Sequence, residues 1–132
     1  MVRKAKEKDL SSLKILIDFA SRKGFILPRS KREIKENLNS FFVALENGKI
    51  VGCCALDIYN WKLAEIRSLV VLPAFQKKGL GRKLVEKCLV KAKKLKIYEV
   101  LSITREDRFF SRLGFRKCLN KQWPMFLKTG SI

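Results

Sequence analysis

Apolar residues recur every three or four positions in several segments of the chain, which is the spacing of one buried face of a helix. In the segment that begins at Leu10, Asp9 stands at the N-cap position and Gly24 marks the end. In the next segment, Ser30 and Glu33 have the spacing of a capping box. The pattern predicts helices over Leu10 to about residue 23, Ser30 to about Leu38, Gly79 to about Lys96, and Glu106 to Leu113. The core stripe expected on the third of these is Leu80, Leu84, Cys88, Ala92 and Leu95.

Other segments combine apolar runs with β-branched and aromatic residues, as strands do. The strands expected are Val2 to Ala5, Phe41 to Leu45, Ile50 to Asp57, Leu63 to Leu72, Tyr98 to Thr104, Phe115 to Leu119, and Met125 to Lys128. Asn47-Gly48 predicts a tight hairpin between the second and third. This order of elements predicts one α/β domain of the α+β type over residues 1–132, with a mostly antiparallel sheet. Residues 63–104 form its strand–helix–strand unit, so a ligand site is expected beyond two parallel strands.

The charge of the chain is strongly one-sided, because 30 Lys and Arg face 12 Asp and Glu, for a net charge of +18. Such a field attracts anions, so phosphorylated cofactors, nucleic acid and acidic lipids are candidate partners. A lysine-rich surface selected for solubility or high temperature would give a similar composition, and the sequence leaves both interpretations open. The first residues lack the apolar core of a signal peptide, and no apolar run approaches the ~20 residues of a membrane span. A cytoplasmic protein without a membrane role is therefore expected.

The chain has no histidine, and its cysteines show no Cys-x-x-Cys pairing. The usual zinc sites and catalysis by a histidine base are therefore not expected, and no metal is assigned. Cys53 and Cys54 lie in an apolar run, and Cys88 lies on the apolar face of a helix. This placement predicts buried, reduced thiols, and Cys118 is included in the same interpretation.

The chemically most informative segment runs from Glu65 to Leu84. It contains an apolar strand, a short connection, the basic loop Gln76-Lys77-Lys78-Gly79-Leu80-Gly81 and the start of a long helix. Backbone amides of such a loop, at the positive end of a helix, are suited to bind phosphate oxygens. Leu84 stands where a dinucleotide fingerprint has its third glycine, and the Gly-Lys-Ser/Thr ending of a Walker loop is absent.

The spacing Gln-x-x-Gly-x-Gly after an apolar strand resembles the acyl-CoA pyrophosphate loop of the GCN5-related N-acetyltransferases (GNAT). The segment Phe109 to Phe115 is similar to the Tyr-x-x-Leu-Gly-Phe ending of that family. Ile26-Leu27-Pro28-Arg29-Ser30 and Ala64-Glu65-Ile66-Arg67-Ser68 resemble, more narrowly, the acetyltransferase domain of short bacterial N-acetylglutamate synthases, which serve arginine biosynthesis. The resemblance covers roughly residues 2–118. It implies acetyl-CoA as co-substrate, and a mixed sheet with a β-bulge, splayed central strands and helices on both faces.

The resemblance also implies where acetyl-CoA binds. The backbone of Leu69, Val70 and Val71 would pair with the pantetheine arm as an added strand. Gln76 would line the approach of the pyrophosphate, and Thr104 and Phe109 would border the far side of the arm. The pyrophosphate itself would be held by the backbone amides of Lys77, Lys78, Gly79, Leu80, Gly81 and Arg82. The charges of Lys77, Lys78 and Arg82 could add phosphate pairing.

The reaction implied is direct attack of an amine on the acetyl thioester. About a tenth of an α-amine with a pKa near ~8 is already neutral at neutral pH, so a modest base suffices. Glu65 acting through water is the candidate base, and an ion pair with Arg67 on the same strand face is the alternative. Phe110 occupies the position of the tyrosine acid of many acetyltransferases. Since a thiolate leaves readily, the missing acid is tolerable.

Arg29 matches the arginine that the family offers to a substrate carboxylate, and Arg67 is a second candidate. The alternative for Arg29 is a solvated arginine at a helix start. The acceptor expected is a small-molecule amine, most simply an amino acid such as glutamate. The alternatives are a protein lysine or N-terminus as acceptor, and a nucleic-acid-binding module, although the lysines do not cluster. The apolar segment Trp123–Leu127 could serve an interface between two copies.

Overall fold

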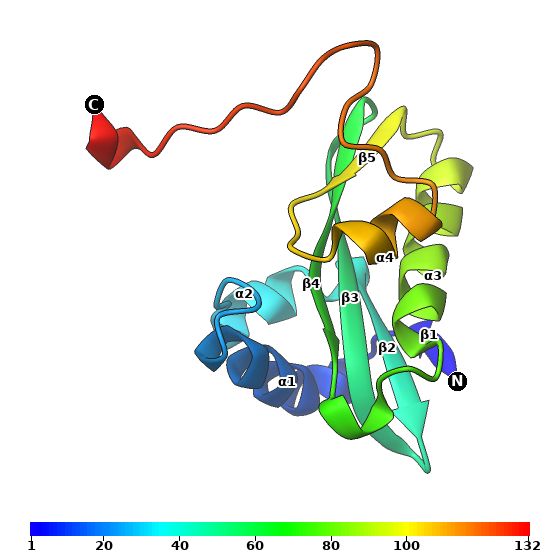
Figure 1. The fold of residues 1–132 in the computed structure, drawn as a ribbon. Helices are drawn as coiled ribbons and strands as arrows, with labels where there is room; N and C mark the ends of the chain where they lie inside the picture. Colours follow the sequence, from blue (N-terminus) through cyan, green and yellow to red (C-terminus); the bar gives the residue numbers. More distant parts are fainter.

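A five-stranded sheet with the strand order β1-β2-β3-β4-β5 divides the molecule, and helices cover both of its faces (Figure 1). The structure is a computed structural model that describes residues 1–132. The strands are β1 (Val2–Lys4), β2 (Phe41–Glu46), β3 (Lys49–Asn60), β4 (Leu63–Val71) and β5 (Glu99–Ser102). The helices are α1 (Leu10–Arg22), α2 (Lys31–Glu36), α3 (Leu80–Lys94) and α4 (Asp107–Arg112). β1 to β4 pair antiparallel, and β4 and β5 pair parallel across the α3 crossover, as the sequence predicts.

The sheet separates two hydrophobic cores. The core under α1 and α2 contains Leu13, Leu16, Ile17, Ala20, Ile34, Phe41, Val43, Cys53, Ala55 and Val70. The core under α3 and α4 contains Phe42, Ala44, Val51, Cys54, Leu56, Ala64, Ile66, Leu80, Leu84, Val85, Cys88, Ala92 and Phe110. Alternate residues of β2 and β3 enter opposite cores, because successive side chains of a strand point to opposite faces. Most of both strands is therefore apolar on both faces, which explains their unbroken apolar runs.

Local signals in the sequence set the ends of several elements. Ser30 caps α2, because its Oγ accepts a hydrogen bond from the backbone N–H of Glu33 over 3.0 Å. Asn47 and Gly48 both adopt positive φ, at 51° and 74°, as a two-residue hairpin turn requires. Asp9 precedes α1, but its carboxylate is bound by Arg3 and by the N–H of Lys6 instead of capping α1.

A β-bulge interrupts β4. Cys53 pairs with Val70 and Ala55 pairs with Arg67, so one residue of β3 stands opposite both Ser68 and Leu69. Ser68 takes a positive φ of 53° at this point. Upstream of Ser68, even-numbered residues of β4 face α3, whereas downstream Leu69 packs toward α3 and Val70 enters the core of α1. Even-numbered side chains of β4 therefore point to α3 before the bulge and to α1 after it.

β5 ends early, and this leaves one edge of β4 free. Ser102 at the end of β5 pairs with Ile66, whereas β4 continues from Arg67 to Val71. The two parallel strands therefore separate beyond the bulge, and the expectation of splayed central strands is confirmed.

Several expectations about individual elements are wrong. The strands expected at 115–119 and 125–128 do not form, and an isolated bridge between Leu119 and Gln122 is the only β pairing there. β3 continues to Asn60, beyond the end expected at Asp57, and therefore includes Tyr59. Leu95 is half exposed, because α3 ends at Lys94, so Leu95 is not part of the core stripe.

The prediction of buried, reduced thiols is confirmed for Cys53, Cys54 and Cys88, and Cys118 is half-buried. Burial raises the pKa of the Cys53 thiol to about 12. The Sγ atoms of Cys54 and Cys88 lie 3.7 Å apart, and their contact and burial raise the pKa of Cys54. Cys53 and Cys54 are therefore protonated packing groups at neutral pH.

Candidate active site

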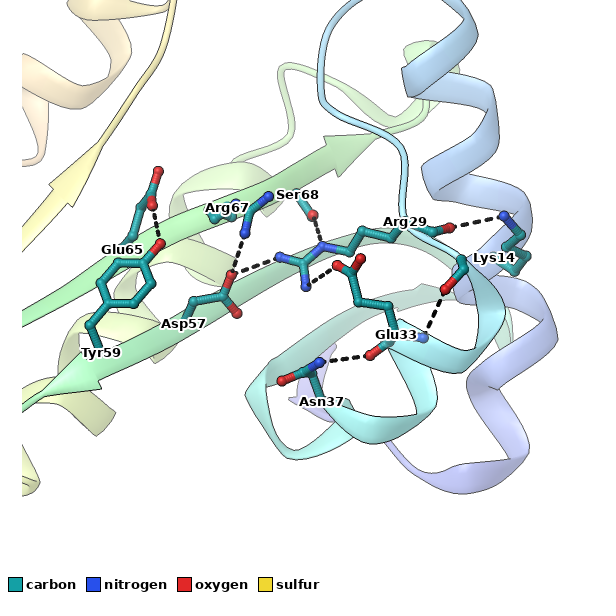
Figure 2. Close-up of polar contacts among 10 residues, drawn as sticks. Lys14, Arg29, Glu33, Asn37, Asp57, Tyr59, Glu65, Arg67 and Ser68 are labelled. Atoms are coloured by element: carbon teal, nitrogen blue, oxygen red, sulfur yellow. Dashed lines mark hydrogen bonds and ion pairs between the residues drawn. The ribbon is translucent and has the colours of Figure 1, made fainter. Parts of the chain in front are cut away.

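A pocket of about 420 Å³ opens on the sheet face that α2 borders. Its lining comes from α2, the segments on either side of it, β3 and β4: Arg29, Glu33, Asn37, Ser40, Asp57, Ile58, Tyr59 and Arg67. Asp57 and Tyr59 alternate along β3, and Glu65 and Arg67 alternate along β4. Alternation brings all four side chains to the same face of the sheet (Figure 2). Charged groups from distant parts of the sequence thereby meet in one place.

Arg29 is buried at the inner wall of this pocket, with 3% of its surface exposed. Its Nε donates to Ser68 Oγ and its Nη2 donates to Asp57 Oδ2, each over 2.9 Å (Figure 2). Its Nη1 lies 3.4 Å from Glu33 Oε2, and the guanidinium stands 5.2 Å from the ring centre of Phe41. The alternative of a solvated arginine is therefore wrong. The longest of these polar contacts joins Arg29 to Glu33, whose side chain is 45% exposed.

Asp57 links the two candidate substrate arginines. Its Oδ2 accepts from Arg29 over 2.9 Å and from Arg67 over 3.1 Å. The Arg67 side chain is 31% exposed, so a solute in the pocket reaches it more easily than it reaches Arg29. Arg67 pairs with Asp57 and not with Glu65, so the ion pair considered as the alternative for Glu65 does not form.

Glu65 instead accepts a hydrogen bond from the hydroxyl of Tyr59 (Figure 2). This hydrogen bond, together with burial and the charge of Glu65, raises the pKa of Tyr59. Sequence reasoning missed Tyr59 because the predicted strand stopped at Asp57. Extending the strand alternation by one step, from Asp57 to Tyr59, would have placed the phenol on the same face.

The segment expected to bind the pantetheine arm lies along the free edge of β4. Leu69, Val70 and Val71 continue beyond the end of β5, and Leu69 and Val71 are half-buried. The side-chain amide of Gln76 donates to the carbonyl oxygen of Val71 over 2.8 Å. Gln76 therefore reaches back to this strand edge from the end of the 3-10 turn Pro73–Phe75.

The glycine loop leads directly into α3. Gly79 has φ 82° at the N-cap, and no side chain caps the helix, so the amides of its first turn keep no side-chain partner. Lys77 also has a positive φ, at 63°. Leu80 is buried in the core, which leaves only its backbone to face a ligand. Such a loop fits a pyrophosphate, because its unpaired amides lie at the positive end of a fifteen-residue helix.

The basic side chains of the loop already have neighbours. The Lys78 ammonium lies 5.3 Å from the ring centre of Phe75, and Arg82 Nε lies 3.6 Å from Glu86. Both Arg82 and Glu86 are more than half exposed, so this ion pair is weak and would yield easily to a phosphate. No acidic partner lies within ion-pair distance of Lys77 or Lys78.

α4 packs beside the start of α3. The ring of Phe109 lies over Gly81, where an added Cβ would be 3.6 Å from the ring, an ordinary van der Waals distance. Phe110 is buried and meets Phe109 and Phe115 edge-on, each at 5.1 Å between ring centres. The Thr104 hydroxyl accepts from the N–H of Glu106 and so shapes the turn between β5 and α4. The structure thus brings Phe109 to the glycine loop and places Thr104 at the end of β5.

The structure contains neither a cluster of metal-ligating side chains nor a membrane-spanning helix. No three or more histidine, cysteine or acidic side chains gather as a metal site would require. None of the helices combines the length and the apolar character needed to cross a membrane.

Comparison with known proteins identifies the family. Residues 11–115 match the model of the acetyltransferase (GNAT) family. An uncharacterized N-acetyltransferase of Chlorobaculum tepidum is 39% identical over 123 residues, which are 93% of this chain and 79% of that protein. An amino-acid acetyltransferase of Mycobacterium tuberculosis is 35% identical over 118 residues, covering 87% of this chain and 67% of the relative.

Solved structures agree with the sequence matches. A Mycobacterium tuberculosis protein crystallised in complex with CoA superposes with a TM-score of 0.85 at 34% identity, over 90% of this chain and 73% of that one. An N-acetylglutamate synthase of Neisseria gonorrhoeae, complexed with coenzyme A and N-acetyl-glutamate, superposes with a TM-score of 0.84 at 25% identity. The match covers 94% of this chain but only 30% of that longer protein. The chain belongs to the GNAT family of N-acetyltransferases, enzymes that take their acetyl group from acetyl-CoA.

Proposed function

We propose that this enzyme acetylates the α-amine of an amino acid, with glutamate as the leading candidate, and that it thereby serves arginine biosynthesis. The observation that carries the proposal is the pocket that Arg29, from the segment before α2, and Arg67, from β4, line beside the free edge of β4. Glu65 lies next to this pocket, where it accepts a hydrogen bond from the lining residue Tyr59. An amino acid needs a cationic group for its carboxylate and a base for its ammonium, and the pocket with the adjacent Glu65 offers both. The names of the amino-acid acetyltransferases among its relatives support the same acceptor class.

The donor would lie along the free edge of β4. In this arrangement the backbone of Leu69, Val70 and Val71 holds the pantetheine arm as an added strand. The amides of residues 77–82 hold the pyrophosphate, with Gln76 beside the arm and with Thr104 and Phe109 on its other side. Gln76 bonds the Val71 carbonyl, so it stands where that strand edge meets the loop.

The acceptor carboxylate would pair with the arginines of the pocket. Arg67 is the more accessible of the two, and its side chain is 31% exposed. At Arg29, the acceptor would replace the long contact of Nη1 with Glu33, because that contact is the weakest of the set. Nε and Nη2 of Arg29 would keep their hydrogen bonds to Ser68 and Asp57. The guanidinium is therefore already oriented when the acceptor binds.

The reaction requires one proton to leave the acceptor ammonium before attack. Glu65, acting through a water molecule, would take this proton, while the hydroxyl of Tyr59 orients the carboxylate. The amine nitrogen then forms a bond to the carbonyl carbon, and the bond from that carbon to sulfur breaks. The sulfur leaves as a thiolate, the nitrogen loses a second proton to solvent and so becomes the amide, and the thiolate takes up a proton. A lysine acceptor, with a pKa of ~10.4, would need a stronger base than Glu65.

The first experiment measures thiol release from acetyl-CoA with a panel of acceptors: glutamate, glutamine, aspartate, lysine, spermidine and a short peptide. We expect turnover with glutamate or a close relative and none with spermidine, because a protein of net charge +18 repels polycations. Protection by acetyl-CoA against thermal unfolding is measured in parallel. Protection without turnover on any amino acid would contradict the acceptor assignment and leave the family assignment standing.

Matched arginine variants then test the pocket. We expect Arg67→Gln and Arg29→Gln each to raise the KM of the amino acid more than about tenfold, with little change in the KM of acetyl-CoA, since lost charged hydrogen bonds of ~1.5–3 kcal/mol correspond to such factors. Arg32→Gln is the control, because Arg32 is 88% exposed and pairs only with Glu36 on the outer side of α2. Arg67→Gln is the decisive variant if Arg29→Gln is poorly folded. An unchanged acceptor KM in Arg67→Gln would contradict the assignment.

A further inference from the structure

The outer face of α3 carries a concentration of positive charge. Residues 77–96, which comprise the end of the glycine loop, α3 and the two residues after it, contain nine basic residues and one acidic residue, Glu86. This short segment therefore supplies +8 of the net charge of +18. α3 stands at one side of the molecule, between the sheet and solvent (Figure 1). The expectation that the lysines do not cluster is therefore wrong for this part of the chain.

The charged side chains of α3 point to solvent because the helix buries its apolar stripe against the sheet. The exposed basic residues, called the α3 basic face below, are Lys77, Lys78, Arg82, Lys83, Lys87, Lys93, Lys94 and Lys96. Lys83, Lys87 and Lys94 have the spacing of one row along a helix. Since α3 has fifteen residues, the row follows an axis of ~22 Å.

Almost none of this charge is neutralised within the molecule. The one ion pair joins Arg82 to Glu86 over 3.6 Å, and both side chains are more than half exposed. The lysines of the α3 basic face have no acidic partner within 4 Å, and Lys83 and Lys87 repel each other at a spacing of four residues. Ion-pair networks that stabilise proteins at high temperature require both signs of charge. Thermal adaptation of that kind therefore does not explain this face.

The co-substrate and the helix dipole account for only part of the face. The pyrophosphate of acetyl-CoA would lie against residues 77–82, whereas Lys87 and Lys94 stand about 8 and 18 Å further along the axis than Arg82. The dipole favours cations in the last turn, where Lys93 and Lys94 lie. It disfavours Lys83 in the first turn and has little effect on Lys87 in the middle. The middle of the face therefore lacks an anionic partner even when the co-substrate is bound.

We propose that the α3 basic face binds the phosphate backbone of duplex DNA without sequence preference. One strand of B-DNA presents a phosphate every 3.4 Å along the axis, so a row of ~22 Å runs beside about six of them. α3 contains no serine, threonine, asparagine, glutamine or aromatic residue. It therefore lacks the hydroxyl, amide and aromatic side chains that contact base edges or the 2′-hydroxyl of RNA, or stack on single-stranded bases.

An anionic membrane surface is the other extended anion to consider. A helix that binds a membrane surface buries its apolar side among the lipids. The apolar stripe of α3 is already buried against the sheet, and Val90 is the only large apolar side chain that the helix exposes. Because α3 has no apolar side to insert, its exposed face suits the regular phosphates of a duplex better than a lipid surface.

Fluorescence anisotropy of a labelled DNA duplex of arbitrary sequence, titrated with the full chain from about 50 to 200 mM salt, tests the proposal. We expect the logarithm of the affinity to fall with the logarithm of salt concentration at a slope near about −5, as for six phosphate contacts. Lys87→Gln combined with Lys94→Gln should make this slope shallower by about two and weaken binding at least about tenfold at ~100 mM salt. An unrelated duplex of equal length should bind equally well.

Lys31→Gln combined with Lys35→Gln is the matched control. Both lysines are exposed on α2, across the sheet from α3, and their loss lowers the net charge by the same amount. This control should keep the wild-type slope. Both double variants change only exposed side chains, so their thermal midpoints should match that of wild type. An equal loss of binding in the two would overturn the proposal, because overall charge and not the α3 basic face would then hold the DNA.

Three further titrations identify the ligand and separate its site from that of the co-substrate. DNA binding should persist when CoA is saturating, because Lys87 and Lys94 lie beyond the glycine loop. Complete loss of DNA binding in the presence of CoA would show that DNA merely occupies the pyrophosphate site. Tighter binding to vesicles rich in anionic lipid, or to a duplex RNA of the same sequence, would overturn the assignment to DNA. Absence of DNA binding at ~50 mM salt would also overturn it.

Discussion

Arg29 Nε donates a 2.9 Å hydrogen bond to Ser68 Oγ, and so connects the start of α2 to the bulge of β4. Ser68 is 8% exposed, and its carbonyl oxygen accepts from the Cys53 thiol over 3.3 Å. The bulge residue is thus held from the pocket side by its hydroxyl and from β3 by its carbonyl. Because the free edge of β4 begins at the bulge, the wall of the acceptor pocket and the donor strand share one support.

Ser68→Ala tests this support. The variant leaves the buried Arg29 Nε without an acceptor, and it should lower the free energy of unfolding by ~1–3 kcal/mol. Ala and Ser tolerate a positive φ about equally badly, so the comparison isolates the hydroxyl. Urea denaturation measures the change, with Ser12→Ala on the exposed side of α1 as the control. Equal stability of the two variants would show that the hydrogen bond has no energetic role.

Asp9→Asn should destabilise the protein in a manner that depends on pH. Arg3 donates to both oxygens of Asp9, over 2.7 and 3.1 Å, and the N–H of Lys6 donates over 2.7 Å. The hydrogen bonds from Arg3, aided by the backbone of Lys6, lower the pKa of Asp9 below its usual 3.8. A lowered pKa in the folded state stabilises the protein above the unfolded-state pKa, and the stabilisation disappears as pH falls through the folded-state value. At pH 7 the loss should be on the order of 3 kcal/mol, because the pair is largely buried.

Urea denaturation of wild type and Asp9→Asn at a series of pH values measures this dependence. The difference between them should be constant near neutral pH and shrink below about pH 4. Asp18→Asn is a suitable control, since Asp18 forms a partly exposed pair with Lys14 on the outer part of α1. A difference that stays constant down to acid pH would mean that the charge of Asp9 is not what stabilises the fold.

Tyr59→Phe should reveal the link between Tyr59 and Glu65 at alkaline pH. The hydrogen bond to Glu65 raises the pKa of Tyr59 above 10. A raised pKa in the folded state stabilises the protein below the unfolded-state pKa, and the stabilisation disappears as pH rises through the folded-state value. Wild type should therefore be slightly more stable than Tyr59→Phe at pH 8 and lose this advantage above about pH 10. Thermal unfolding of both proteins over this range measures it, and a gap that widens with pH would contradict the assignment.

The same variant has an expected effect on catalysis. If Tyr59 orients Glu65, Tyr59→Phe should lower kcat more than it changes the KM of the amino acid, because the base is then free to rotate. The steady-state parameters of Tyr98→Phe supply the control, since Tyr98 is 70% exposed and lies beyond the pocket.

Gly79→Ala tests the glycine loop. Alanine at φ 82° costs roughly 1–2 kcal/mol or displaces the loop, although no atom would obstruct the added Cβ. A displaced loop should reduce the thermal protection that CoA gives. Gly48→Ala is a matched control, because Gly48 has φ 74° with equally open surroundings but lies in the β2–β3 hairpin. Both variants should lose similar stability, and only Gly79→Ala should bind CoA more weakly. Equal CoA affinity in the two variants would argue against a role of this loop.

The local signals of the sequence predict most of the fold. Asn47-Gly48, the Ser30 cap and Gly79 each act within a few residues, and the structure shows the turn, helix start and loop that each requires. The parallel pairing of β4 and β5 follows from their connection through α3 alone.

What the sequence cannot show is which distant charges meet. No pattern in the sequence singles out Asp57. In the structure, however, its carboxylate accepts hydrogen bonds from both Arg29 and Arg67, so it links three separate parts of the chain. The burial of Arg29 likewise depends on Phe41 and Ser68, which lie 12 and 39 positions away. Such contacts depend on strand register, and strand register was not available from residue spacing.

The strands expected after α4 do not form, for a related reason. Phe115–Leu119 and Met125–Lys128 have suitable composition, but a strand requires a partner as well as propensity. Asn120 and Lys121 turn the chain, and only the bridge between Leu119 and Gln122 forms before the two arms part.

The extra residue at the bulge has a consequence for how β4 can be altered. Before Ser68, the side chains of odd-numbered residues of β4 point to the acceptor pocket, and after Ser68 they point to α3. Deleting Ser68 would therefore remove the bulge without turning either half of the strand over, because Leu69 would then stand opposite Cys54 and still face α3, and Arg67 would stay on the acceptor side. The deletion would instead remove the hydroxyl that accepts the hydrogen bond from Arg29.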